Sequence, residues 1–165
     1  KDSAEKLIRQ YHTKAPFVKQ LMDNVSRKAN DRGKIRTLLG RACHFDLWQP
    51  VQFGVFKPLP LEMARKEYDE PLKRAFTYKA LNKLIQGSAA DIIKLAMIGV
   101  HGAMQEEQVK SKMLLQVHDE LVFDVHESEV EMMQNLVKKE MESAIELVVP
   151  MEVEIEVADN WLDAH

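Results

Sequence analysis

Between residues 112 and 125, hydrophobic and polar positions alternate in two runs that are separated by His118, Asp119 and Glu120. A period of two residues is typical of strands that bury one face. The pattern therefore predicts an antiparallel hairpin with these three polar residues at its tip. The side chains that we expect to face the core are Met113, Leu115, Val117, Leu121, Phe123 and Val125.

The tip of this hairpin has an unusual composition. Tight hairpins ordinarily turn on Asn-Gly, Asp-Gly or a Gly-containing pair, because the favoured turns need a positive φ. None of these pairs occurs at residues 118–120, and such local departures often mark functional sites. Asp119 and Glu120 are candidate ligands for Mg²⁺, which is usually held by one or two carboxylates together with substrate phosphates. The alternative is a turn that Asp tolerates and whose charges are solvated.

Apolar residues at intervals of three and four predict several helical segments. The first two cover residues 2–11 and 16–32, and the second begins at a proline. A longer helical stretch runs from Pro71 to about residue 105, and a last helix covers residues 128–148. The chain thus combines helices with a few strands.

Three further segments complete the predicted fold. Residues 34–45 predict a small hairpin that turns near Gly40. Residues 46–70 carry three prolines and few periodic positions, so we expect a long ordered loop there. Residues 151–157 alternate apolar residues with glutamates, which predicts a third strand with one buried and one acidic face.

A polar stripe follows the predicted helix after Pro71. Tyr78, Asn82 and Gln86 are spaced four residues apart, which places their side chains along one helix face. Amides both donate and accept hydrogen bonds, and the minor groove of a duplex presents acceptors at every base pair. The stripe is therefore a candidate contact with duplex nucleic acid, the alternative being that these residues are simply exposed.

Composition limits the class of protein. The chain has 165 residues, of which 45% are hydrophobic and 30% charged, as in an ordinary soluble domain. No apolar run approaches the length of a membrane span, and the N-terminal residues lack a signal-peptide core. The single cysteine excludes an internal disulfide. We expect an intracellular protein without a membrane partner.

Charge is unevenly distributed along the chain. Residues 1–41 carry 11 Lys and Arg against 4 Asp and Glu, although the net charge of the whole chain is −3. This asymmetry favours a segment that faces phosphates, with a solvated basic helix as the alternative. Within it, Arg36 and Arg41 are candidate contacts with a template phosphate.

Two blocks of sequence resemble the family A DNA polymerases, the DNA polymerase I family. The string Gln-Val-His-Asp-Glu-Leu-Val-Phe at residues 116–123 is similar to motif C of that family. Asn82, followed by Gln-Gly-Ser-Ala-Ala-Asp-Ile-Ile-Lys at residues 86–94, is similar to a block that lies a short distance upstream in the family. The two blocks occur here in the same order.

The resemblance implies an α+β fold. An antiparallel palm sheet, made of the hairpin and the C-terminal strand, would pack against helices, with finger-region helices at the N-terminus. Residues 1–70 would form part of the fingers subdomain, with the small hairpin and an inserted loop. Residues 71–165 would form the C-terminal half of the palm.

The resemblance also implies roles for individual residues. Asp119 matches the motif C aspartate, Glu120 its supporting neighbour, and His118 the residue beside the primer 3′ end, so these three are the candidate catalytic residues. Asn82 and Gln86 match minor-groove contacts on the primer-template. The implied reaction is nucleotidyl transfer at a two-metal Mg²⁺ site, with primer-template DNA and deoxynucleoside triphosphates as partners.

Two motifs of the family do not occur in the sequence: the Asp-Tyr-Ser string of motif A and the Lys…Tyr-Gly helix of motif B. By the resemblance, the chain is the C-terminal part of a larger or split polymerase. It would then need the remainder of that polymerase, in the same or a separate chain, and should not polymerise alone. We expect it in the cytoplasm of a bacterium or of a phage-infected host cell.

Two other functions stay open on the sequence. One is a metal-dependent phosphohydrolase that uses His118 and Asp119 as a ligand pair. The other is a non-catalytic nucleic-acid-binding module that uses the basic N-terminal segment and the polar stripe.

Overall fold

The computed structural model describes residues 2–164. The chain divides into two compact units, Lys1–Ser88 and Ala89–His165, and the division falls inside one helix, α4 (Ala80–Glu106). Small antiparallel sheets pack against helices, which confirms the predicted α+β class. Among the described residues, no helix is both long and apolar enough to cross a membrane.

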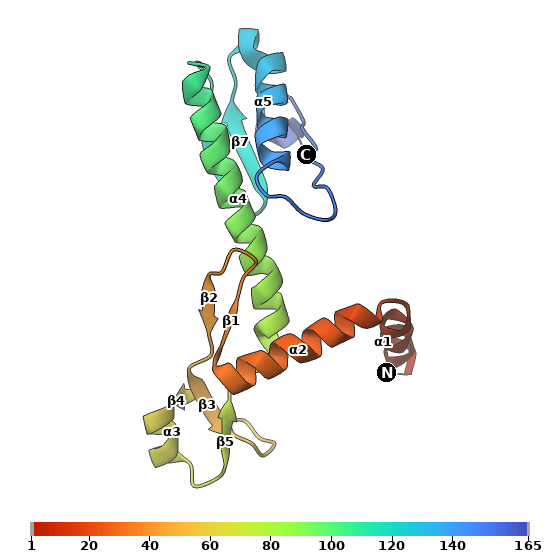
Figure 1. The fold of residues 1–165 in the computed structure, drawn as a ribbon, viewed down its shortest axis with the longest axis vertical. Coiled ribbons are helices and arrows are strands. Elements are labelled where there is room, and N and C mark those ends of the chain that lie inside the picture. The colour runs from red at the N-terminus through yellow and green to blue at the C-terminus, as the bar shows by residue number, and fades with distance from the viewer. Residues whose placement is uncertain (1, 165) are drawn as a thin grey trace. The chain divides into compact units, whose positions relative to one another are not determined.

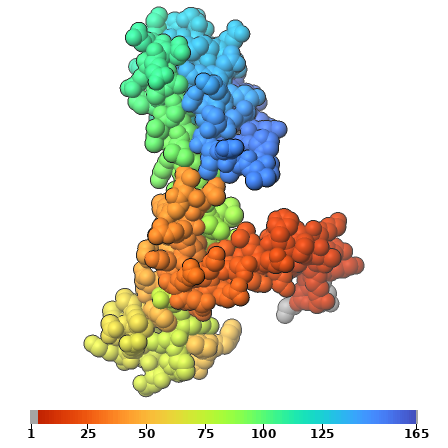
Figure 2. All heavy atoms as spheres, in the orientation of Figure 1, coloured from red at the N-terminus to blue at the C-terminus, as the bar shows by residue number. Residues whose placement is uncertain are grey.

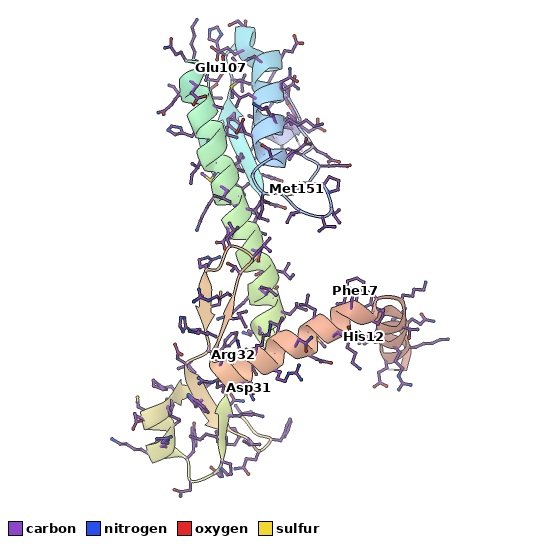
Figure 3. The ribbon with its side chains drawn as sticks, viewed as in Figure 1. His12, Phe17, Asp31, Arg32, Glu107 and Met151 are labelled. Atoms are coloured by element: carbon purple, nitrogen blue, oxygen red, sulfur yellow. The ribbon has the colours of Figure 1, made fainter. Side chains whose placement is uncertain are left out.

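The first unit begins with two helices, α1 (Asp2–Lys14) and α2 (Pro16–Arg32), which meet at Ala15 (Figure 1). The helix N-terminus tolerates Pro16 because its missing N–H has no partner in the first turn. After Arg32, labelled in Figure 3, Gly33 takes a left-handed φ of 67°, and its N–H donates to the Ala29 carbonyl. Both predicted helices are confirmed.

The predicted small hairpin is also confirmed. Strands β1 (Lys34–Arg36) and β2 (Ala42–His44) are antiparallel, and Gly40 has a φ of 88° in their connection. The hairpin packs on α2, and its connection contacts α4 at Gly87 and Ser88. The buried core of this unit consists of Val25, Ala29, Ile35, Phe45 and Ala80.

The predicted loop at residues 46–70 is wrong. The inserted segment, residues 46–74, contains β3 (Leu47–Pro50), β4 (Leu59–Pro60), α3 (Leu61–Glu67) and β5 (Leu72–Arg74). The strands form an antiparallel sheet in the order β4-β3-β5, and the yellow atoms of this segment gather in a lobe in Figure 2. Pro50 and Pro60 end β3 and β4, and Pro58 and Pro71 directly precede β4 and β5. A missing N–H is tolerated at such positions, so these prolines do not exclude strands.

One arginine ties the inserted segment to the rest of its unit. The Arg74 side chain donates to the carbonyls of Asn30, at 3.1 Å, and Phe45, at 2.9 Å. Its guanidinium also lies 4.5 Å from the centroid of the Trp48 ring. Gly33 leaves room for this arrangement, since a Cβ there would lie 2.6 Å from the Arg74 guanidinium carbon.

The prediction that a helix begins at Pro71 is wrong. Residues 72–74 pair with β3 as strand β5, and Phe76 then takes a left-handed φ of 61°, which a right-handed helix cannot contain. A 3₁₀ turn, η1 (Thr77–Lys79), follows, and α4 begins at Ala80. Pairing with β3 therefore overrides the helical spacing of this stretch.

The second unit contains the rest of α4, the hairpin of β6 (Lys112–Val117) and β7 (Glu120–Asp124), and α5 (Val130–Glu142). A 3₁₀ turn, η2 (Glu127–Glu129), leads into α5, and another, η3 (Trp161–Ala164), lies near the C-terminus. Figure 1 shows α4, β7 and α5 side by side. Their buried core consists of Val100, Met104, Met133 and Val137, with Met113, Phe123, Val125 and Ile155 packed against it.

The predicted C-terminal strand is wrong. The structure describes residues 151–157 and assigns no strand there. Burial still alternates from Met151, labelled in Figure 3, to Ile155, which packs on the core, while the intervening glutamates are exposed. The N–H of Val153 donates to the Glu142 carboxylate at 3.1 Å. The period of two therefore predicted the inward-facing side chains as far as Ile155, whereas Val157 is 57% exposed, and it did not predict the hydrogen-bond partners of the backbone.

Candidate functional site

The central hairpin turns more tightly than the sequence predicts. Val117 pairs with Glu120, so the turn consists of two residues, His118 and Asp119, and Glu120 begins β7. His118 has a φ of 55°, a left-handed conformation that favours glycine. The side-chain amide of Gln116 donates a hydrogen bond to the His118 carbonyl across this turn. The turn is thus tight, and an imidazole residue occupies its strained position.

A β-bulge in β6 changes which side chains face the core. Met113 pairs with Phe123 and Leu115 with Val122, so Leu114 is the extra residue. Residues opposite each other in an antiparallel pair point to the same face, so Met113 lies on the core side with Phe123. Leu115 lies on the other face and is 50% exposed. The predicted burial of Leu115 is therefore wrong, because the bulge interrupts the alternation.

The two candidate metal ligands are both exposed. Asp119 lies in the turn and Glu120 at the first position of β7. In the part of the chain that the structure describes, no three His, Cys, Asp or Glu side chains come together as a metal site. Two adjacent carboxylates fit the part of a Mg²⁺ shell that a protein usually supplies, since water and substrate phosphates provide the other ligands. The hairpin thus suits a partial site.

One carboxylate closes the base of the same hairpin. Glu129, in η2, accepts hydrogen bonds from the Ser111 hydroxyl at 2.6 Å, the Ser111 N–H at 2.9 Å and the Lys110 N–H at 2.9 Å. The hydroxyl bond from Ser111, together with the Lys110 N–H, lowers the pKa of Glu129 from 4.5 to about 2. The Ser111 oxygen in turn accepts from the His126 N–H at 3.0 Å. The residues before β6 and after β7 are therefore held together.

The polar stripe lies in the first unit. Asn82 and Gln86 are exposed on α4, one helical turn apart. Tyr78 is 72% exposed but belongs to η1, so the stripe does not lie on one continuous α-helix as predicted. The Tyr78 ring packs edge to face against the Phe76 ring, with the two ring centroids 6.5 Å apart. The three candidate duplex contacts are thus accessible, and two of them share a helix face.

The small hairpin docks beside Gln86. The Leu38 N–H donates to the Ser88 hydroxyl at 2.9 Å, and the Arg41 guanidinium donates to the Gly87 carbonyl at 2.8 Å. A Cβ on Gly87 would lie 2.8 Å from the Thr37 methyl carbon, so only glycine allows this close approach. Gly87 and Ser88 therefore form the docking point of the hairpin, a role that sequence reasoning missed.

The two candidate phosphate contacts each have an internal hydrogen bond. Arg36 donates to the Gly40 carbonyl at 2.6 Å and so holds the turn of the small hairpin. Arg41 holds the hairpin to α4 through Gly87. Both residues are exposed. Their contact with phosphate stays a prediction.

The sequence model of DNA polymerase family A matches residues 1–163. The chain therefore belongs to DNA polymerase family A. It is 38% identical to DNA polymerase I of Lactococcus lactis subsp. cremoris over 162 residues, which cover 98% of this chain and 16% of that protein. It is 37% identical to DNA polymerase I of Geobacillus stearothermophilus over 165 residues, which cover 99% of this chain and 17% of that protein.

A solved structure supports the same assignment. The fold is similar, with a TM-score of 0.79 and 34% identity, to the POL domain of Pol1 from M. smegmatis in complex with DNA primer-template and dNTP. The match covers 99% of this chain and 26% of that chain. The chain spans about a sixth of the length of the curated relatives described above.

Proposed function

We propose that this chain is the C-terminal catalytic segment of a template-directed DNA polymerase, with residues 1–70 in the fingers and residues 71–165 in the palm. The observation that carries the proposal is the exposed Asp119-Glu120 pair on a tight, strained hairpin, in a chain that belongs to DNA polymerase family A. A backbone strained at a surface turn and fixed at its base suits a site that must hold its ligands in one geometry.

The carboxylates of the hairpin would hold Mg²⁺. Asp119 would be the principal ligand, and Glu120 would assist it, while His118 would lie beside the primer 3′ end. When two Mg²⁺ ions are bound, they stabilise the attacking and leaving oxygens of an in-line phosphoryl transfer. The chain's own contribution would be to hold the backbone at Asp119 in place, through the two-residue turn and the closure of the hairpin base by Glu129.

The exposed face of η1 and α4 would hold the duplex. Asn82 and Gln86 can donate to the acceptors that the minor groove presents at every base pair, and Tyr78 would extend this contact. Such contacts test duplex shape without dependence on sequence, which a copying enzyme requires. Arg36 and Arg41 would add contacts with template phosphates.

The remaining parts of the site would come from elsewhere in the polymerase. The sequence contains neither the Asp-Tyr-Ser string of motif A nor the Lys…Tyr-Gly helix of motif B. A second aspartate and the cationic groups that bind the incoming nucleotide would therefore be supplied by other residues of the polymerase, in the same or a separate chain. The 165 residues alone should show no primer extension.

Replacing Asp119 tests the proposal. In the polymerase that contains this chain, Asp119→Ala should lower primer extension at least 10³-fold, because the cation loses its main protein ligand, while affinity for primer-template falls less than threefold. Asp124→Asn is the matched control, since Asp124 is an exposed carboxylate at the other end of β7. Unchanged synthesis by Asp119→Ala would contradict the proposal and favour a non-catalytic nucleic-acid-binding role.

A further inference from the structure

Two lysines lie beside the exposed amides of the first unit. Lys79 is the last residue of η1, and Lys83 lies in the first turn of α4. The Lys79 ammonium is 5.0 Å from the centroid of the Phe76 ring and 5.7 Å from that of Tyr78. The Lys83 ammonium is 4.8 Å from the centroid of the Phe45 ring.

These aromatic contacts restrain the lysines without neutralising them. A ring face attracts a cation through its quadrupole and carries no net charge. Both lysines are exposed, and within residues 2–164 neither forms an ion pair with a carboxylate. Two oriented positive charges are therefore available to an anion from outside the chain.

The spacing along the chain places each lysine next to one of the two amides, Asn82 and Gln86. Lys83 and Gln86 are three residues apart on α4, and Lys79 precedes Asn82 by three, so each lysine neighbours an amide on the surface. Lys79 and Lys83 are four residues apart across the junction of η1 and α4, so their side chains lie about one helical turn apart on the same surface. The two ammonium groups can thus bind phosphates of one strand.

We propose that Lys79 and Lys83 form a phosphate-binding row that fixes the duplex while the amides of Asn82 and Gln86 contact its minor groove. The minor groove is only about 6 Å wide and is bordered by the phosphates of both strands. A row of cations parallel to the amides therefore meets the backbone of one strand when the amides are in the groove. This inference rests on the proposed function and adds the phosphodiester backbone as the ligand of these two lysines.

The test is the salt dependence of DNA binding by the polymerase that contains this chain. Affinity for a primer-template is measured between 50 and 200 mM NaCl for Lys79→Gln, Lys83→Gln and the double variant. The slope of log affinity against log salt is negative, and removing one phosphate-binding lysine should reduce its magnitude by about 0.9, so the double variant should show a reduction of about 1.8. The decrease should be equal for primer-templates of different sequence, because phosphates carry no sequence information.

Control variants separate charge from folding. Lys66→Gln removes an exposed lysine from α3 in the same unit and should leave the slope unchanged. Lys79→Arg with Lys83→Arg keeps the charge and should keep the slope. Phe76→Leu removes one restraining ring and should weaken binding about two- to fivefold with the slope unchanged, because the ammonium remains.

The outcomes distinguish this inference from the proposed function. If Asn82→Ala and Gln86→Ala weaken binding but the double lysine variant keeps the full slope, the lysine row is wrong and the duplex contact stands. If the amide variants and the lysine variants all bind as tightly as the parent, the duplex contact itself is wrong. An equal decrease of the slope in Lys66→Gln would also overturn the inference, since any surface lysine would then suffice.

Discussion

At the scale of single residues, Glu129 shows how one carboxylate fixes the central hairpin. It accepts hydrogen bonds from the Ser111 hydroxyl and from two backbone N–H groups just before β6. The neighbouring positions 128–131 have the spacing of a helix N-terminus, which the sequence shows, but the partners Lys110 and Ser111 lie 19 and 18 positions away. Local sequence patterns do not predict contacts between residues that are so far apart in the sequence.

Glu129→Gln should lower the melting temperature at neutral pH, because the N–H groups and the Ser111 hydroxyl lose a charged acceptor. The pKa of Glu129 is lowered to about 2, so the carboxylate contributes stability above the unfolded pKa of about 4.5, and this contribution is lost as pH falls toward 2. The difference between variant and parent should therefore shrink between pH 4.5 and 2. Thermal unfolding at a series of pH values measures it.

Glu131→Gln is the matched control, because Glu131 is an exposed glutamate on the first turn of α5. It should leave the melting temperature nearly unchanged. A Glu129→Gln variant as stable as the parent at pH 7 would show that the closure of the hairpin base does not stabilise this unit.

His118 combines backbone strain with its proposed position beside the primer end. A left-handed φ costs a non-glycine residue about 1 kcal/mol, and His118 has a φ of 55°. His118→Gly should therefore raise the free energy of unfolding by about 1 kcal/mol while it lowers primer extension by the polymerase. Urea unfolding and single-turnover extension measure the two effects. A His118→Gly variant that is less stable than the parent but extends primers at the full rate would contradict both the strain at His118 and its proposed position beside the primer end.

At the scale of elements, the docking of the small hairpin on α4 depends on one missing side chain. Gly87→Ala would bring a Cβ within 2.8 Å of the Thr37 methyl carbon, and Thr37 is buried. The hairpin would have to move, which should cost about 1–3 kcal/mol of unfolding free energy. We also expect weaker binding of primer-template, because Gln86 is the adjacent residue.

The same helix offers a control. A Cβ on Gly102 would meet nothing within 4 Å, so Gly102→Ala should be neutral or stabilise α4 by up to about 1 kcal/mol. Chemical denaturation of both variants checks the comparison. Equal destabilisation at Gly87 and Gly102 would show that the close approach of the hairpin does not matter.

The elements also show where periodicity predicts structure and where it does not. The helices α1, α2 and α5 and both antiparallel hairpins were predicted, because each has a repeated apolar face or an alternating run. The last helix, however, ends at Glu142 and not at residue 148 as predicted. The sheet of the inserted segment was not, because its strands have two to four residues, too few to display a period. The bulge at Leu114 and the missing strand at residues 151–157 depend on backbone pairing, which side-chain alternation does not determine.

At the scale of the whole molecule, the α+β class and the family were predictable, because two long blocks of sequence carry the resemblance and the family match covers residues 1–163. The division of the chain into two units between Ser88 and Ala89 was not predictable, since it falls inside one continuous helix with no change of periodicity. Asp119 and Glu120 became candidates because their turn departs from ordinary hairpin composition, and the resemblance to the family added His118; the roles of all three stay predictions. Gly87, Glu129, Lys79 and Lys83 were missed, because their roles depend on contacts between elements.

The central claim is that the hairpin carboxylate of Asp119 holds a divalent cation at the primer end. It is tested most directly by anomalous diffraction from the polymerase that contains this chain, crystallised with primer-template, an incoming nucleotide and Mn²⁺ in place of Mg²⁺. The account predicts an anomalous peak about 2.0–2.2 Å from an Asp119 carboxylate oxygen, next to the primer 3′ end. Mn²⁺ bound elsewhere beside the nucleotide, with the Asp119 carboxylate free in solvent, would contradict it.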